Sequence, residues 1–221
     1  MKIGLLGTGN LAAALGDAWA AAGHSIMVTG RRPDRAKAVA ERIGAAATSV
    51  DPGELAREAD VVVVAVAWDG LEPALRLVGG PDGSLSGKTV IDCTNPVDYA
   101  TGRLLPETGS AAEAVAGVAV GARVVKALHL FAGASWPFAG DVEASPVVAI
   151  CGDDADALGR TAALIGDLGA RTAVLGGGLA AARQAEEAAG FVMRVVGAGA
   201  NPRFAVPDVA PALLRTATAD H

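Results

Sequence analysis

A short glycine-rich segment near the N-terminus constrains the fold more than any other feature of this sequence. Residues 7–12 read Gly-Thr-Gly-Asn-Leu-Ala, the pattern G-x-G-x-x-A, and they follow an apolar run over Lys2–Leu6. A run of this kind is typical of a strand that is buried on both faces. Apolar side chains then recur at helical spacing from Asn10 to Ala22, and Gly23 stands where a helix would end. The sequence therefore opens with a strand, a tight turn and a helix.

The rest of the chain continues this alternation. Further strands are predicted at Ser25–Thr29, Ala45–Thr48, Val61–Val66, Thr89–Asp92, Val124–Leu128, Pro146–Cys151 and Thr172–Leu175, and further helices at Asp34–Arg42, Pro52–Glu58, Leu71–Val78, Ala111–Ala116, Ala155–Leu168 and Leu179–Val196. Strands that alternate with helices form parallel sheets, because parallel neighbours need a crossover connection. We expect an α/β fold: a Rossmann-like, doubly wound parallel sheet with a smaller C-terminal α/β lobe.

The glycine turn predicts a dinucleotide site. Gly7 permits the tight turn, Gly9 lets a pyrophosphate approach the backbone, and the small Ala12 lets helix and strand pack closely. The free N–H groups and the positive end of the helix that begins at Asn10 attract phosphates. The motif alone is a weak signal, but here it lies between a strand and a helix, which is the context that the motif requires.

The end of the second predicted strand indicates which dinucleotide binds. An acid normally stands there when the ribose 2′-hydroxyl of NAD is recognised. This chain has Thr29, Gly30, Arg31 and Arg32 instead, with Arg35 one turn later. Guanidinium groups can clamp a 2′-phosphate, which an acid would repel. The sequence therefore favours NADP(H) over NAD(H).

Six segments together resemble the coenzyme F420:NADP oxidoreductases, the NADPH-dependent reductases of a deazaflavin. They are LLGTGNLA at 5–12, GHSIMVTGRR at 23–32, VVVAVAW at 62–68, VVKALH at 124–129, PVVAICGDD at 146–154, and the Gly177, Leu179, Arg183 arrangement. The resemblance spans about residues 1–190. It implies NADP contacts at Thr8, Gly9, Asn10, Leu11, Arg31 and Arg35, with Trp68 beside the cofactor, and it implies that the loop from His129 lies by the nicotinamide and the deazaflavin ring.

The predicted sites combine the motif and the resemblance. The expected cofactor-binding residues are Gly7, Thr8, Gly9, Asn10, Leu11, Thr29, Arg31, Arg32, Arg35, Ala65, Val66, Trp68 and Asn95. His129 is the candidate catalytic residue, because it ends a parallel strand at the edge where such sheets bind ligands. His129, Phe131 and Trp136 are the candidate substrate residues, since the aromatic side chains of this loop either line an apolar acceptor pocket or bury the loop itself.

Three parts of the chain are expected. Residues 1–128 would form the NADP-binding Rossmann domain, residues 129–200 a C-terminal lobe that completes the acceptor site, and residues 201–221 a loosely attached tail containing Pro202, Pro207 and Pro211. An apolar stripe through Val192, Val195 and Val196 would pack either on the sheet or on a second subunit, and we expect a homodimer.

Composition excludes several classes of protein. A net charge of −6 argues against nucleic acid as a partner. The apolar runs are shorter than the ~18–20 residues that span a bilayer, so no membrane is expected. Cys93 and Cys151 lie 58 positions apart and form no metal-binding pattern, so we expect no metal, two free buried thiols and a reducing cytoplasm.

The sequence predicts an NADP-dependent oxidoreductase that transfers a hydride between NADP(H) and the deazaflavin coenzyme F420. Positioning two flat rings is most of what such a reaction needs, so the lack of an obvious catalytic triad is compatible with an enzyme. Two alternatives stay open. One is an NADPH-dependent reductase of a small ketone, imine or flavin, and the other is a non-catalytic NADPH sensor, because a nucleotide site does not establish turnover.

Overall fold

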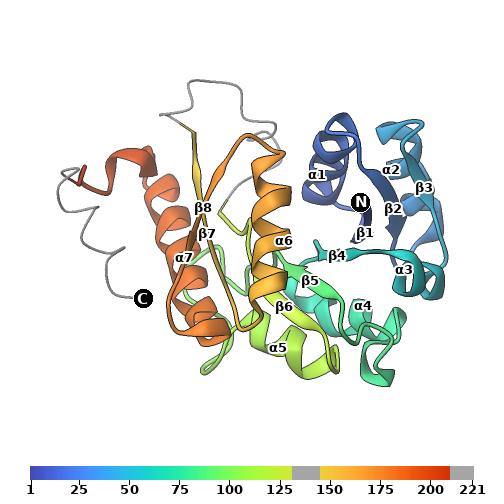
Figure 1. The fold of residues 1–221 in the computed structure, drawn as a ribbon. Coiled ribbons are helices and arrows are strands. Elements are labelled where there is room, and N and C mark those ends of the chain that lie inside the picture. The colour runs from blue at the N-terminus through green and yellow to red at the C-terminus, as the bar shows by residue number, and fades with distance from the viewer. Residues whose placement is uncertain (131–144, 210–221) are drawn as a thin grey trace.

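The computed structural model describes residues 1–130 and 145–209, and these residues form one mainly parallel sheet covered by helices (Figure 1). The strands are β1 Lys2–Leu6, β2 Ser25–Thr29, β3 Ala47–Ser49, β4 Val61–Val64, β5 Thr89–Asp92, β6 Arg123–Lys126, β7 Val147–Gly152 and β8 Arg171–Val174. The sheet order is β3-β2-β1-β4-β5-β6-β7-β8. All neighbours are parallel except β6 and β7, which are antiparallel.

Seven α-helices connect and cover these strands in the described part of the chain. They are α1 Asn10–Ala21, α2 Pro33–Ile43, α3 Pro52–Glu58, α4 Leu71–Leu77, α5 Ala111–Val118, α6 Ala155–Gly166 and α7 Ala182–Gly197. Short 3-10 turns lie at η1 Trp68–Gly70, η2 Gly80–Asp82, η5 Gly178–Ala181 and η6 Pro202–Phe204. The fold is the expected Rossmann-like α/β sheet.

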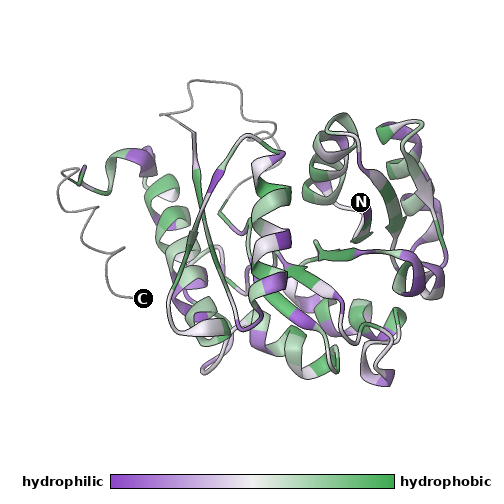
Figure 2. Cartoon of the chain, in the orientation of Figure 1, coloured by the Kyte–Doolittle hydropathy of each residue, from purple (hydrophilic) through white to green (hydrophobic). Residues whose placement is uncertain are grey.

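Each face of the sheet has its own apolar core. Side chains of α1, α2 and α6 form one cluster with the sheet, and side chains of α3, α4, α5 and α7 form the other. The strands are the most apolar parts of the chain, and the helices show polar residues on their outer faces (Figure 2). Trp19 ties the first cluster together, because its buried indole Nε1 donates to the Leu164 carbonyl oxygen at 2.9 Å. This polar contact links α1 to α6 across 145 positions of sequence.

The order of the strands produces a switch point beside the glycine turn. From β1 the chain steps outward to β2 and β3, then returns to pair β4 on the other side of β1. The connections that leave β1 and β4 therefore diverge to opposite sides and open a crevice at the carboxyl edge. Ligands of doubly wound sheets bind in such crevices.

Several elements differ at their edges from those predicted from the sequence, and β6, for example, ends at Lys126 rather than Leu128. The fourth strand ends at Val64 rather than Val66, and the expected helix from Leu179 begins as the 3-10 turn η5 before α7 starts at Ala182. The C-terminal α/β segment continues the main sheet through the β6–β7 pair. The division into residues 1–128, 129–200 and 201–221 stays a prediction. No helix among the described residues is both long and apolar enough to cross a bilayer.

Candidate active site

A hollow of about 500 Å³ lies over the glycine turn at the carboxyl ends of β1, β2 and β4. Its walls come from residues 6–9 after β1, from residues 30–35 after β2, and from residues 65–74 after β4. A dinucleotide half of adenosine size fits a site of this volume and position. The switch point of the sheet is therefore a real hollow and not only a topological feature.

The glycine turn leaves its backbone open to a ligand. Gly7 has a φ of +139°, and a Cβ there would overlap the carbonyl oxygen of Ala65, so only glycine fits between β1 and β4. Gly9 is different, because a Cβ at Gly9 would have no atom within 4 Å. Helix α1 begins after Gly9 with no side-chain cap and no acid in its first turn. The first N–H groups of α1 thus remain available for phosphate oxygens.

Three arginines stand on the opposite wall of the same hollow. Arg31, Arg32 and Arg35 all line it. Arg32 pairs with Asp34 at 3.0 Å on the surface, whereas the Arg31 guanidinium reaches across to η1, where a Cβ at Gly70 would lie 3.4 Å from its Nη2. The Arg31 side chain therefore extends from the end of β2 to the segment after β4, on the opposite side of the hollow. The arrangement can hold a 2′-phosphate by charge-assisted hydrogen bonds.

A second hollow, of about 450 Å³, adjoins the first at Gly9 and at residues 65–69. Its remaining lining includes Trp68, Cys93, Asn95, Val97, Tyr99 and Leu105. The two hollows share one wall with the pyrophosphate turn between them, which is the shape that an extended dinucleotide requires. The second hollow is mainly apolar and carries the tyrosine of this chain on its rim, 66% exposed.

A small hairpin supplies the outer wall of the second hollow. Residues 96–105 fold back on themselves through the Val97–Leu104 bridge, and the Leu105 N–H donates to the Pro96 carbonyl oxygen at 2.7 Å. Helix α7 holds this hairpin from behind. Gly190 packs so closely on Gly102 that a Cβ on Gly190 would overlap the Gly102 carbonyl oxygen.

One face of α7 makes further contacts with the segment after the hairpin. Arg183 Nη1 donates to the Gly109 carbonyl oxygen at 2.8 Å, and the Ala111 N–H donates to Glu186 at 3.0 Å. The three α7 positions 183, 186 and 190 follow helical spacing, so they lie along one face of the helix. Residues 102–112 are therefore anchored to α7 along their length.

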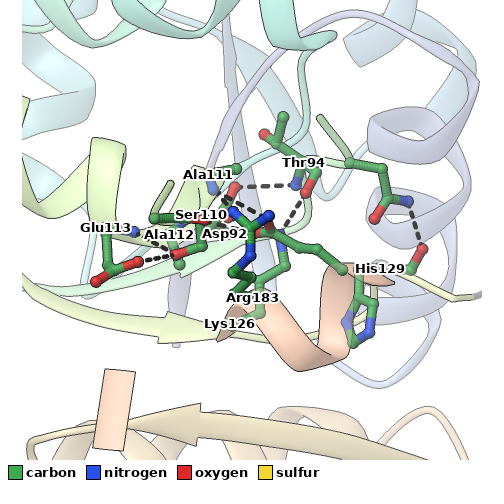
Figure 3. A network of polar contacts seen from close by, with 12 residues as sticks. Asp92, Thr94, Ser110, Ala111, Ala112, Glu113, Lys126, His129 and Arg183 are labelled. Carbon is green, nitrogen blue, oxygen red and sulfur yellow. Dashed lines mark hydrogen bonds and ion pairs between the residues drawn. The ribbon is translucent and has the colours of Figure 1, made fainter. Parts of the chain in front are cut away.

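A fully buried ion cluster lies next to Thr94, which stands between two residues that line the second hollow, and Figure 3 shows the polar contacts of the cluster. Lys126 Nζ, on β6, contacts Asp92 Oδ2 at 2.8 Å and Glu186 Oε1 at 2.9 Å, and it also donates to the Thr94 carbonyl oxygen. Burial opposes the charged form of Lys126, but the two carboxylates outweigh it and raise the pKa of the lysine. Burial also raises the pKa of Glu186, against the opposing effects of Lys126 and the Ala111 N–H.

His129 lies next to this cluster and is 5% exposed. Burial, together with the charge of Lys126, lowers the pKa of His129 to about 3. The imidazole is therefore neutral at ordinary pH. The preceding residue, Leu128, has a φ of +60°, a strained conformation for a leucine, and this turns the chain at the end of β6. The carbonyl oxygen of His129 accepts a hydrogen bond from Asn95 Nδ2 at 2.6 Å.

The structure brings most of the predicted site residues together. The first hollow contains Gly7, Thr8, Gly9, Arg31, Arg32, Arg35, Ala65 and Val66, and the second contains Asn10, Leu11, Trp68 and Asn95. Thr29 lines neither, since its buried hydroxyl donates to the Val50 carbonyl oxygen at 3.0 Å. His129 also lines neither hollow and stays a prediction as a catalytic residue. Phe131 and Trp136 lie outside the described residues.

Sequence reasoning missed Tyr99, Leu105, Lys126 and Glu186. A lysine within the apolar strand 124–128 was a signal of a buried ion pair, and an acid on the apolar side of the last helix was its counterpart. Cys93 and Cys151 are free and buried, as expected. Burial raises the pKa of both thiols, that of Cys151 to about 11. Among the described residues no group of three or more His, Cys, Asp or Glu side chains is placed to hold a metal ion.

The structure is similar to several solved structures. A protein of Arthrobacter sp. FB24, provisionally described as an F420-dependent NADP reductase, matches with a TM-score of 0.79 and 27% identity over 90% of this chain and 96% of that one. A hypothetical protein of Sinorhizobium meliloti matches with a TM-score of 0.69 and 27% identity over 82% and 87% of the two chains. An imine reductase of Myxococcus stipitatus, solved with NADP⁺, shares the fold at 19% identity and a TM-score of 0.67. This chain covers 63% of that reductase.

The fold, the two joined hollows and these similarities define the protein as an NADP-dependent oxidoreductase. Within this class, residues 2–96 match the family described as NADP oxidoreductase coenzyme F420-dependent. The matched segment contains the glycine turn, the three arginines and the strand end that leads into the second hollow.

Proposed function

We propose that the protein transfers a hydride between NADP(H) and a deazaflavin, coenzyme F420. The observation that carries this proposal is the second hollow, which is apolar and opens directly from the dinucleotide turn. The matches to F420-dependent NADP oxidoreductases in residues 2–96 and to the Arthrobacter protein support the same acceptor. When bound, NADPH supplies the hydride, and the deazaflavin takes it together with one proton from solvent.

In this proposal each hollow binds one half of the dinucleotide. Arg31 and Arg35 bind the 2′-phosphate end, and the backbone N–H groups after Gly9 bind the pyrophosphate. The nicotinamide half then lies in the second hollow, between the loop after β5 and the Trp68 side. Leu105 and Tyr99 offer the acceptor ring an apolar and aromatic surface, which also excludes water. Catalysis by this site rests on alignment of two rings.

The direct test follows the absorbance of a deazaflavin after rapid mixing with NADPH-loaded protein. We expect the deazaflavin to be reduced at a rate of about 1 per second or faster, and to be reduced faster with NADPH than with NADH. A protein that binds NADPH normally but reduces no deazaflavin would contradict the proposed acceptor, and the class of NADP-dependent oxidoreductase would stand.

Tyr99 supports a second candidate function, the reduction of a small ketone or imine. Such substrates need a proton donor near the hydride acceptor, and Tyr99, which lines the second hollow, carries a hydroxyl that can donate one. Replacement of Tyr99 by phenylalanine separates the two functions. Loss of a general acid lowers kcat by about 10²–10⁴-fold. Transfer to a deazaflavin should change by less than about threefold, because ring alignment does not need the hydroxyl.

A further inference from the structure

The buried cluster of Asp92, Lys126 and Glu186 is larger than the fold needs for stability. All three side chains are completely buried, although a pair of well-packed apolar residues would stabilise such a core at least as well. The cluster lies under the loop of residues 93–95, which follows β5, and Cys93 and Asn95 of that loop line the second hollow. The position of the cluster beside the second hollow and the free-energy cost of desolvating three charged groups together indicate a role beyond stability.

The cluster binds both backbone polar groups of Thr94, in the middle of this loop. The Thr94 N–H donates to Asp92 Oδ1 at 2.9 Å, and the Thr94 carbonyl oxygen accepts from Lys126 Nζ. Asp92 thus uses one carboxylate oxygen for the loop and the other for Lys126, at 2.8 Å. The two polar groups of one peptide position are fixed by two charged side chains, and charge-assisted hydrogen bonds are the strongest of their kind.

Glu186 has a different task in the same cluster. Its two oxygens accept from the Ala111 N–H, each at 3.0 Å, and so bind the first turn of α5. The hydroxyl of Ser110, the N-cap of that helix, accepts from the Glu113 N–H at 3.1 Å. Glu186 therefore connects α7 to α5, and among the described residues its hydrogen bonds go to Ala111, Ala112 and Lys126 rather than to the loop of residues 93–95.

We infer that Asp92 and Lys126 are positioning residues of the nicotinamide half of the site, because they hold the loop 93–95 in the conformation that forms the floor of the second hollow. This inference rests on the proposed function, since it takes the nicotinamide to lie in that hollow. The adenosine half lies over Arg31 and shares no residue with the loop 93–95. Disturbing the cluster should therefore affect one half of the ligand and spare the other.

Two isosteric substitutions test this within one cluster. Asp92→Asn and Glu186→Gln each leave one lysine and one carboxylate, so each variant keeps a balanced buried pair. Asp92→Asn places an amide N–H₂ group toward either Lys126 or the Thr94 N–H, both of which are donors. One of the two hydrogen bonds that hold the loop is therefore lost. Glu186→Gln instead loosens α5 and leaves Asp92, Lys126 and Thr94 together, which makes it the matched control.

The measurement compares two probes by calorimetry: NADPH, and 2′-phosphoadenosine 5′-diphosphoribose, which lacks the nicotinamide. For Asp92→Asn we expect the affinity for NADPH to fall about tenfold and that for the fragment to stay within about twofold. The fluorescence of bound NADPH should also move toward that of the free cofactor. For Glu186→Gln the ratio of the two affinities should stay within about twofold of the wild-type ratio.

Several results would overturn the inference. Equal losses for both probes in Asp92→Asn would show a general structural role, and no loss for either probe would show that the loop does not need the cluster. A ratio that changes as much in Glu186→Gln as in Asp92→Asn would do the same. If Asp92→Asn does not fold, Asp92→Glu tests the same point, because its longer side chain moves the carboxylate away from Thr94 while it keeps the charge.

The outcome is separate from that of the deazaflavin assay. The two affinities need no hydride acceptor, so failure to reduce a deazaflavin leaves this test valid. A wild-type protein without affinity for NADPH would overturn both proposals.

Discussion

Gly9 offers a clean separation of folding from binding. A Cβ at this position meets no atom of the protein within 4 Å, and the Gly9 φ of −85° suits any residue. We predict that Gly9→Ala shifts the Tm by less than about 2 °C. The same methyl group would stand where the pyrophosphate approaches the backbone, so the NADPH affinity should fall by about tenfold or more. Thermal melts and fluorescence titration check the two halves, and an unchanged affinity would contradict the predicted phosphate position.

Arg31 carries the expected preference for NADP(H). Its guanidinium reaches across the first hollow to the segment after β4, while that of Arg32 is engaged by Asp34 at 3.0 Å. A charged hydrogen bond contributes about 1.5–3 kcal/mol, so Arg31→Ala should reduce the preference over NAD(H) by about tenfold or more. Arg32→Ala is the control and should have the smaller effect. Titration of both nucleotides on both variants provides the measurement, and equal effects would show that the two arginines share the phosphate.

His129 makes the stability of the protein depend on pH. The pKa of His129 is about 3 in the folded protein and about 6.5 in the unfolded chain, so the unfolded chain binds the proton first as the pH falls. The stabilising contribution is complete above pH 6.5 and is lost toward pH 3. Between pH 7 and pH 5 the free energy of unfolding should fall by about 2 kcal/mol from this residue alone.

Urea denaturation at the two pH values tests the role of His129. His129→Gln should lose most of this pH dependence. A slope that His129→Gln does not change would show that folding does not lower the pKa of His129, and would contradict the burial of a neutral imidazole.

At the scale of elements, α7 packs closely against the hairpin 96–105 that lines the second hollow. Gly190→Ala would push against the Gly102 carbonyl oxygen, and overpacking of this kind costs about 1–3 kcal/mol. We predict that the Tm falls and that the KM for the acceptor rises, while the affinity for NADPH changes little. The control is Gly159→Ala in α6, where a Cβ meets nothing within 4 Å and should stabilise the helix by about 0.5–1 kcal/mol. A Gly190→Ala variant as stable as the wild type would contradict the close contact.

Most elements could be predicted because their boundaries are local. The strands are short apolar runs bounded by glycine or charged residues, so β1, β2 and β5 have the expected limits. The antiparallel pairing of β6 and β7 could not be predicted, because the direction of a strand depends on the connection that leads to it and not on the strand itself. The glycine turn and the arginines are likewise local. Lys126 and Glu186 are 60 positions apart, and their pairing arises only from packing.

The hairpin shows the same limit at the active site. Its residues 96–105 form a single isolated bridge and contain little apolar periodicity, so the sequence suggested only a loose connection. The sequence predicts the acceptor pocket at Phe131 and Trp136, which lie outside the described residues and stay a prediction. Tyr99 takes its place at the second hollow through the contacts of α7 with the hairpin, and such contacts leave no pattern in the sequence.

For the whole molecule, a homodimer stays our proposal. Exposed large apolar side chains gather in the C-terminal part of the described chain: Val174 on β8, Phe191 and Val196 on α7, and Phe204 on η6. This part lies at the opposite end of the sheet from β3 (Figure 1). Sedimentation equilibrium should give about twice the 21.8 kDa of the chain, and Phe191→Ser should shift the protein toward the monomer. A monomer at all concentrations would contradict the proposal.

The hairpin has a consequence for how such enzymes diversify. The family match ends at residue 96, and the hairpin begins there. In the function that we propose, the nucleotide-binding part of the chain and the wall that would meet the acceptor are therefore successive segments that join at one residue. Exchange of the roughly ten residues of this hairpin, which α7 holds in place, can alter the hydride acceptor. The glycine turn that binds the phosphates then stays unchanged. Proteins that descend from one ancestor can in this way keep NADPH as the source of the hydride and change the compound that accepts it.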